Sequence, residues 1–188
     1  GVQTCALPIY DSIVSPEGDG AYSAIIQFKQ SKSMFKLSKT KEWSNVYGSS
    51  SEAVTSSLMV GPGDIPSALV GPDLASPYTY DNYNVIANTN TLAISYELLS
   101  WGLIGSATAG SWDNDTPMKF NNTTKIWSIT TDLSAGEIKF RKNHNWGVNL
   151  GGSGGTLTPG GSNIAIAAAG NYTITLNVEA NTYTIVKN

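Results

Sequence analysis

Two tryptophans in the second half of the chain lie where a place in a hydrophobic core is not expected. Trp112 sits in the Gly/Ser-rich stretch 109–115 (AGSWDND), and Trp146 follows the loop 143–145 (NHN). Flat aromatic faces suit the apolar faces of pyranose rings. An exposed tryptophan is costly, because burial of a large apolar side chain contributes roughly 1.5–3 kcal/mol. The rings therefore predict either a sugar-binding surface or, as the alternative, plugs that fold back over the ends of a domain.

Hydrogen-bonding side chains precede Trp146 along the chain. In the segment 137–142 (EIKFRK), apolar and charged residues alternate. This alternation predicts a strand with Lys139 and Arg141 on the face opposite to its apolar side chains. The guanidinium of Arg141 and the amide of Asn145 can form forked hydrogen bonds with adjacent sugar hydroxyls.

Residues suited to enzymatic chemistry are sparse. The single histidine, His144, lies in a loop, where we expect it to be solvated rather than paired with a nucleophile. Glycoside hydrolysis requires two carboxylates that face each other across a cleft. The carboxylates nearest to such a role are Asp113, Asp115, Asp132 and Glu137, and turn chemistry or solvated charge explains all four. We therefore predict a non-catalytic protein without cofactor or metal, and an enzyme is the least favoured hypothesis.

Composition excludes several classes of partner. The chain has 188 residues, a formal net charge of −3 and only 13% charged residues, so it lacks the basic surface that nucleic acids or anionic membranes require. Its 40% hydrophobic content suffices for buried cores. No apolar run approaches the roughly 18–20 residues that span a bilayer, and we expect any export signal or anchor to lie outside this fragment. The single cysteine, Cys5, excludes an intrachain disulfide.

Apolar residues recur mostly at every second position, which predicts an all-β chain. Segments 22–28 and 127–133 are typical of half-buried antiparallel strands, with Trp101 and Trp127 expected in a core. Segments 171–178 and 182–186 are predicted to form a closing hairpin, and 83–87 and 91–98 another.

The chain also repeats itself. The matching pairs are Tyr22 and Trp127, Phe35 and Phe140 (both 105 apart, 127 − 22 and 140 − 35), Trp43 and Trp146 (146 − 43 = 103), and Tyr83 and Tyr172 (172 − 83 = 89). The falling offsets place extra residues of the first copy in the Ser/Gly/Pro-rich stretch 49–77, which is predicted to be a long loop. The sequence thus predicts two copies of a β-domain of about 90 residues, 10–98 and 99–188.

The first copy is predicted to be incomplete. Residues 1–9 (GVQTCALPI) resemble the translation of a sequencing adapter, and we interpret them as a non-native leader. The second copy opens at Trp101, and at the offset of 105 its opening segment 101–112 has no counterpart beyond residue 7 (112 − 105 = 7). We therefore expect an exposed strand edge in the first copy, where its opening strand should pair.

Motifs throughout the second copy are similar to those of the SusE/SusF family of outer-membrane starch-binding lipoproteins. They are WGLIG (101–105), SWD (111–113), Met118, KFR (139–141), NW (145–146), Asn149, GG (151–152), GSNI (161–164) and GNY (170–172). The first copy resembles the preceding module of that family through DGAY (19–22), FK (35–36) and Trp43.

The resemblance implies tandem immunoglobulin-like β-sandwiches that bind starch-like α-glucan, or a related polysaccharide, without cleaving it. It implies a cell-surface location in the outer membrane, other outer-membrane glycan-uptake proteins as further partners, and a binding site formed by Trp112, Lys139, Arg141, Asn145 and Trp146. Whether Lys139 or Arg141 is the main donor stays open.

A weaker second site is expected in the first copy. Trp43 and Lys36 are its candidate residues. We expect weaker binding there, because this copy has Met34 in place of Lys139 and lacks a counterpart of Trp112. The rival interpretation of the whole chain is a structural spacer or protein-interaction sandwich. In that case both tryptophans of the second copy would be almost completely buried, and no polar donors would converge on them.

Overall fold

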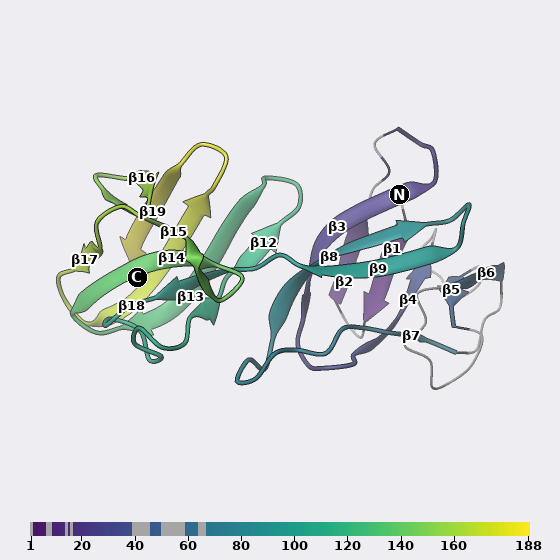
Figure 1. Ribbon diagram of the computed structural model, residues 1–188, viewed down its shortest axis with the longest axis horizontal. Coiled ribbons are helices and arrows are strands. Elements are labelled where there is room, and N and C mark those ends of the chain that lie inside the picture. Colours follow the sequence, from purple (N-terminus) through teal and green to yellow (C-terminus); the bar gives the residue numbers. More distant parts are fainter. Residues whose placement is uncertain are drawn as a thin grey trace. The chain divides into compact units, whose positions relative to one another are not determined.

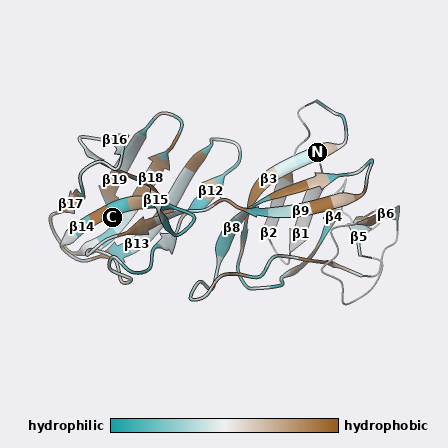
Figure 2. Cartoon of the chain, in the orientation of Figure 1, coloured by the Kyte–Doolittle hydropathy of each residue, from teal (hydrophilic) through white to brown (hydrophobic). Residues whose placement is uncertain are grey.

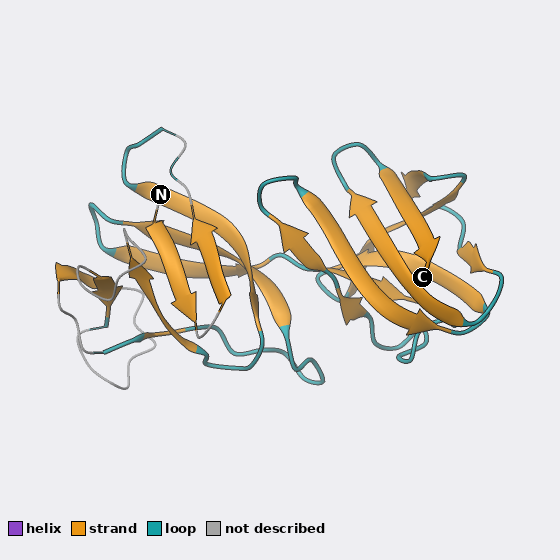
Figure 3. Ribbon diagram, turned by 180° about the vertical axis from the view of Figure 1, so that it is seen from behind, coloured by secondary structure: helices purple, strands orange, loops and turns teal. Residues whose placement is uncertain are grey.

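The computed structural model describes residues 2–6, 9–13, 15, 17–38, 46–49, 59–63 and 67–188. The regular elements of these residues are all strands (Figures 1 and 3). They form two compact units, Gly1–Leu98 and Leu99–Asn188. In each unit, sheets face one another in layers, which confirms the predicted all-β class and its tandem immunoglobulin-like sandwiches.

The C-terminal unit contains ten strands. They are β10 (Trp101–Ile104), β11 (Thr116–Pro117), β12 (Lys119–Asn121), β13 (Ile126–Leu133), β14 (Gly136–Lys142), β15 (Asn145–Ser153), β16 (Thr156–Pro159), β17 (Ile164–Ile166), β18 (Gly170–Asn177) and β19 (Thr182–Lys187). They pair antiparallel in the order β11-β10-β14-β15-β16-β19-β18-β13-β12, and β17 also pairs with β14. The path passes from one layer to the other at the Thr156–Thr182 pair of β16 and β19 (Figure 1).

The core of this unit follows the alternation of the sequence. Ile138 and Phe140 of β14 are fully buried, as are Ile174 and Leu176 of β18. Figure 2 shows hydrophobic and hydrophilic positions interleaved along these strands. Because successive side chains of a strand point to opposite faces, every second residue enters the space between the layers. Trp101 and Trp127 are also buried, which confirms their predicted place in the core.

The N-terminal unit contains nine strands among its described residues. They are β1 (Val2–Ala6), β2 (Ile9–Ile13), β3 (Ala21–Phe28), β4 (Met34–Ser38), β5 (Val46–Gly48), β6 (Val60–Gly63), β7 (Leu69–Val70), β8 (Asp81–Asn88) and β9 (Ala93–Leu98). One sheet has the order β3-β8-β9, and the other has the order β2-β1-β4-β5-β6 with β7 on β4. The core between them includes Phe28 and Phe35, whose rings meet edge to face at 5.8 Å.

The internal repeat extends to the boundaries of the strands. The offset of 105 carries β3 onto β13 (21 + 105 = 126, 28 + 105 = 133). The offset of 89 carries β8 onto β18 (81 + 89 = 170, 88 + 89 = 177) and β9 onto β19 (93 + 89 = 182, 98 + 89 = 187). The two units therefore share one strand framework.

One expectation about the first unit is wrong. The edge of β4 that we expected to be unpaired carries β1, with Cys5 opposite Lys36. In the C-terminal unit, Gly102 of β10 lies opposite Arg141, and Arg141 is the counterpart of Lys36 (36 + 105 = 141). The strand β1 thus occupies the place that β10 has in the other unit. Antiparallel pairing uses backbone groups, so it does not depend on where the sequence of residues 1–9 comes from, which stays a prediction.

The close approach at Gly105 yields a test of the fold. A Cβ at this glycine would collide with the backbone carbonyl of Glu137 on β14, and its φ of 146° is unfavourable for other residues. We expect Gly105→Ala to lower the free energy of unfolding of the C-terminal unit by about 2 kcal/mol or more. Urea unfolding followed by tryptophan fluorescence measures this unit well, because four of the five tryptophans lie in it.

Gly154→Ala is the matched control. Gly154 also has a positive φ, 59°, but nothing lies within 4 Å of its added Cβ. Its substitution should cost only the backbone strain, about 1 kcal/mol. Equal losses in the two variants would show that the contact of Gly105 with β14 is unimportant.

Candidate functional site

Trp112 is positioned by a loop that closes on itself. The loop runs from Gly105, at the end of β10, to Asp115, just before β11. The N–H of Gly105 donates to the carbonyl of Ser111 at 2.9 Å, and the N–H of Ser111 donates to the carbonyl of Thr108 at 3.1 Å. The Thr108 hydroxyl donates in turn to the carbonyl of Gly105 at 2.9 Å. These bonds fix the backbone beside Trp112, whose side chain is half-buried.

Trp146 is positioned by the turn that joins β14 to β15. Asn143 and His144 both have positive φ, 50° and 57°, as a two-residue type I′ hairpin turn requires. The turn is anchored at Ser100, which exchanges two hydrogen bonds with Asn143 at 2.8 and 2.9 Å. Just after the turn, the pairing of β14 and β15 shifts register between Arg141 and Lys142. The extra residues of β15, 146–148, are therefore left outside the ladder, and Trp146 is 44% exposed.

The two tryptophan rings lie side by side. Their centroids are 6.1 Å apart, and the ring planes are inclined by 38°. The guanidinium carbon of Arg141 lies 5.1 Å from the centroid of the Trp146 ring, a cation–π contact. The structure thus brings together Trp112, Trp146 and Arg141. The rings are not buried to the extent that the spacer interpretation requires.

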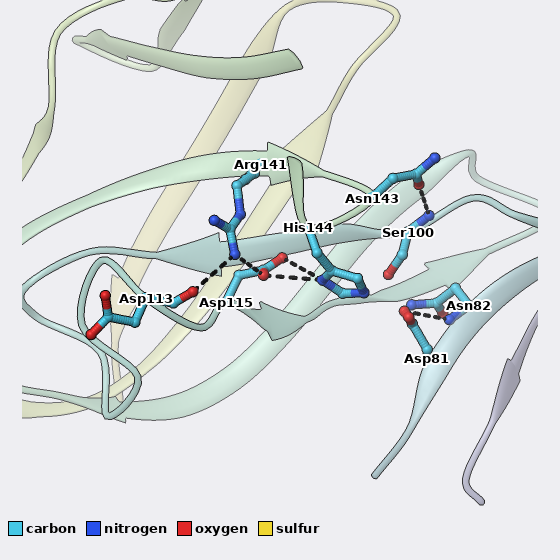
Figure 4. Close-up of polar contacts among 8 residues, drawn as sticks. All are labelled: Asp81, Asn82, Ser100, Asp113, Asp115, Arg141, Asn143 and His144. Carbon is cyan, nitrogen blue, oxygen red and sulfur yellow. Dashed lines mark hydrogen bonds and ion pairs between the residues drawn. The ribbon is translucent and has the colours of Figure 1, made fainter. Parts of the chain in front are cut away.

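Arg141 forms a buried ion pair with Asp115. The residue is 4% exposed, and its Nη2 donates to Asp115 Oδ1 at 2.5 Å and to the Asp113 carbonyl at 3.4 Å (Figure 4). Its Nε is buried and has no hydrogen-bond partner.

The expectation for Asp115 and His144 is wrong. The side chain of Asp115 is fully buried and that of His144 is 11% exposed, whereas the sequence suggested solvated groups. His144 Nδ1 lies 3.0 and 3.1 Å from the two carboxylate oxygens of Asp115 (Figure 4). Burial is possible because Gly102 of β10 has no side chain, and a Cβ there would collide with Asp115 Oδ2. A glycine inside a strand signals such a close approach, and this was the available clue.

The other predicted site residues lie on the same hairpin. Lys139 is half-buried and precedes Arg141 by two residues, so both point to the face of β14 opposite to Phe140. Asn145 is exposed, and its Oδ1 accepts a hydrogen bond from the N–H of Gly147 at 2.7 Å.

Asn149 has a supporting role that its sequence position did not predict. It pairs with Arg141 across the strands, and its Nδ2 donates to the carbonyl of Trp146 at 2.9 Å. This bond fixes the backbone on which the Trp146 ring is carried. The Asn149 Oδ1 is buried and has no hydrogen-bond partner.

The expected weaker site in the N-terminal unit stays a prediction. Lys36 is half-buried on β4, whereas Trp43 lies outside the described residues. Met34, the counterpart of Lys139 (34 + 105 = 139), is 69% exposed.

In the described part of the chain, no group of three or more His, Cys, Asp or Glu residues is placed to hold a metal ion. Among these residues there is also no helix of the length and apolar character needed to cross a membrane.

Comparison with known proteins identifies relatives of the C-terminal unit. Residues 101–184 match the family model described as SusF/SusE starch-specific carbohydrate-binding modules. Among solved structures, the chain is similar to the crystal structure of SusF from Bacteroides thetaiotaomicron, with 15% sequence identity and a TM-score of 0.38. That match covers 98% of this chain and 47% of the SusF chain, so this chain spans about half the length of that relative. No curated protein matches the chain.

The burial of the Asp115–Arg141 pair yields a prediction about stability. Arg141→Leu should lower the free energy of unfolding by about 3–5 kcal/mol, because it leaves a buried carboxylate without its ion-pair partner. The double variant Arg141→Leu/Asp115→Leu should recover most of this loss, since it buries neither charge. Urea unfolding by tryptophan fluorescence measures both.

Lys139→Leu serves as the control on the same face of β14. Lys139 is half-buried and is not part of the buried pair, so its removal should change stability by less than about 1 kcal/mol. A double variant as unstable as Arg141→Leu would contradict the assignment of the loss to an uncompensated charge.

Proposed function

We propose that the C-terminal unit, whose residues 101–184 match the family model of SusF/SusE starch-specific carbohydrate-binding modules, binds an α-glucan on the surface formed by Trp112 and Trp146. The family consists of non-catalytic binding modules, and the chain is accordingly a glycan-binding protein rather than an enzyme.

The inclination of the two rings carries the proposal. An α(1→4)-linked glucan curves into a helix, so the faces of its successive glucose rings are inclined to one another. A β(1→4)-linked glucan is instead a flat ribbon. Two tryptophan rings 6.1 Å apart and inclined by 38° suit neighbouring residues of a curved chain. Each ring would cover the apolar face of one glucose, which removes apolar surface of both partners from water.

Side chains of the hairpin formed by β14 and β15 are the candidate hydrogen-bond donors to the glucose hydroxyls. Arg141 is largely committed to Asp115, so Lys139 is the cation with more freedom to reach a hydroxyl. Asn145 is exposed at the start of β15, next to Trp146, and its amide nitrogen can donate to the same sugar. We therefore assign the main donor role to Lys139 and a supporting role to Asn145.

Affinity at this one site should be modest. Few groups contact the ligand, and a flexible glycan loses conformational freedom when it binds. A second site in the N-terminal unit, at Lys36 and Trp43, would raise the avidity of the chain for a long polysaccharide. We therefore propose that the protein lies on the bacterial cell surface, where it retains starch for outer-membrane uptake proteins.

Isothermal titration of the full chain tests the site and the glycan together. Maltoheptaose should bind, and cellohexaose, the β(1→4)-linked comparison, should bind much more weakly. Trp112→Ala and Trp146→Ala should each reduce affinity for maltoheptaose at least about tenfold, or 1.4 kcal/mol, because each removes one stacking surface. Val186→Ala is the control, since Val186 is an exposed apolar residue on β19.

Two results would overturn the proposal. Equal affinity for the two glucans would contradict the argument from ring inclination. Absence of binding to any soluble glucan, in a wild-type chain that unfolds cooperatively, would favour the spacer function.

The donor assignment has its own test. Lys139→Ala should weaken maltoheptaose binding at least about tenfold, because a hydrogen bond to a charged group contributes roughly 1.5–3 kcal/mol. Its unfolding midpoint should not change. Lys125→Ala removes an exposed lysine from the turn between β12 and β13 and should leave affinity unchanged. Unchanged affinity in Lys139→Ala would transfer the donor role to Arg141.

A further inference from the structure

We propose that Asp115 is a positioning residue that sets the relative orientation of Trp112 and Trp146 before any ligand arrives, and thereby sets glycan affinity. Its side chain is fully buried, so it does not contact the glycan itself. The effect on affinity rests on the proposed function, whereas the effect on ring orientation does not.

Asp115 joins the two segments that carry the rings. It lies three residues after Trp112 in the same loop, and it contacts the other segment twice. One contact is the Nη2 of Arg141 on β14, and the other is the Nδ1 of His144 in the turn two residues before Trp146 (Figure 4). A single carboxylate therefore couples the loop at 105–115 to the hairpin formed by β14 and β15.

Arg141 transmits this coupling to both rings. Its guanidinium lies 5.1 Å from the Trp146 ring centroid, and its Nη2 also reaches the carbonyl of Asp113, the residue next to Trp112. Because Nε is buried and has no acceptor, the contacts of Nη2 determine how the planar guanidinium is oriented. The bond to Asp115 is the shortest of them, at 2.5 Å.

The charge of Asp115 matters more than its size. An asparagine would fit the space beside Gly102, since its side chain has nearly the same shape. Its neutral amide would give Arg141 and His144 a weaker acceptor on one side and a donor on the other. Arg141 would then lose its fixed orientation, and both rings would become free to adopt several angles. Binding would have to order them, which lowers affinity.

Circular dichroism of the ligand-free chain tests the orientation directly. Two indoles at 6.1 Å couple and give an exciton couplet in the far ultraviolet, which Trp112→Ala and Trp146→Ala identify by removing it. In Asp115→Asn we expect the couplet to fall to less than half, and affinity for maltoheptaose to fall about five- to tenfold. Asp132→Asn is the matched control, because it also removes one negative charge, from an exposed aspartate on β13.

A second variant keeps the test decisive if Asp115→Asn does not fold. Arg141→Lys retains a cation for Asp115, so it limits the loss of stability, but an ammonium cannot hold the carboxylate and cover the Trp146 ring at once. It should reduce the couplet in the same way. A couplet of wild-type size in whichever of these variants folds overturns the proposal, and so does wild-type affinity with a reduced couplet.

Failure of the proposed function gives a different pattern. A wild-type chain that binds no glucan contradicts the α-glucan site, but its couplet can still be compared with that of Asp115→Asn. Loss of the couplet in that variant would support Asp115 as the residue that orients the rings, and its retention would overturn this role.

Discussion

The ion pair between Asp115 and Arg141 is the constraint on which the arrangement of the site depends. Two buried charges lose their hydration, and the net stability gained from such a pair is small or negative compared with apolar side chains of similar size. Its physical effect is directional, because a carboxylate and a planar guanidinium bind best in a few geometries. The geometry of the aromatic surface follows from this pair.

Several local features are consequences of accommodating it. Gly102 leaves the space that the carboxylate fills, and a side chain at this position of β10 would displace Asp115. The register shift between Arg141 and Lys142 lets Arg141 remain under the loop while residues 146–148 stand outside the ladder. The ladder hydrogen bonds lost in this way are replaced in part by Asn149, whose amide holds the carbonyl of Trp146. Exposure of Trp146 and burial of Arg141 thus have one structural cause.

The sequence predicted the framework better than the site. Period-two alternation and the offsets of 105 and 89 locate β3, β13, β8 and β18, because these features depend on neighbours along the strand and on a repeated pattern. The burial of Asp115 depends instead on the pairing of β10 with β14 and on Gly102 between them. The charge of Asp115, its position in a turn and the composition of its loop are all local features, and each suggested that its side chain is solvated. Long-range pairing also explains why β1 was missed, since backbone groups alone complete the edge of β4.

A comparison of the two units separates the fold from the site. The register that sets Gly102 opposite Arg141 sets Cys5 opposite Lys36 in the N-terminal unit. At this register position the N-terminal unit thus has a cysteine in place of the glycine, and a lysine in place of the arginine. The same strands therefore recur without the arginine of the buried ion pair. The fold depends on apolar alternation, whereas the aromatic surface depends on Gly102 of β10, Arg141 of β14 and Asp115 of the loop.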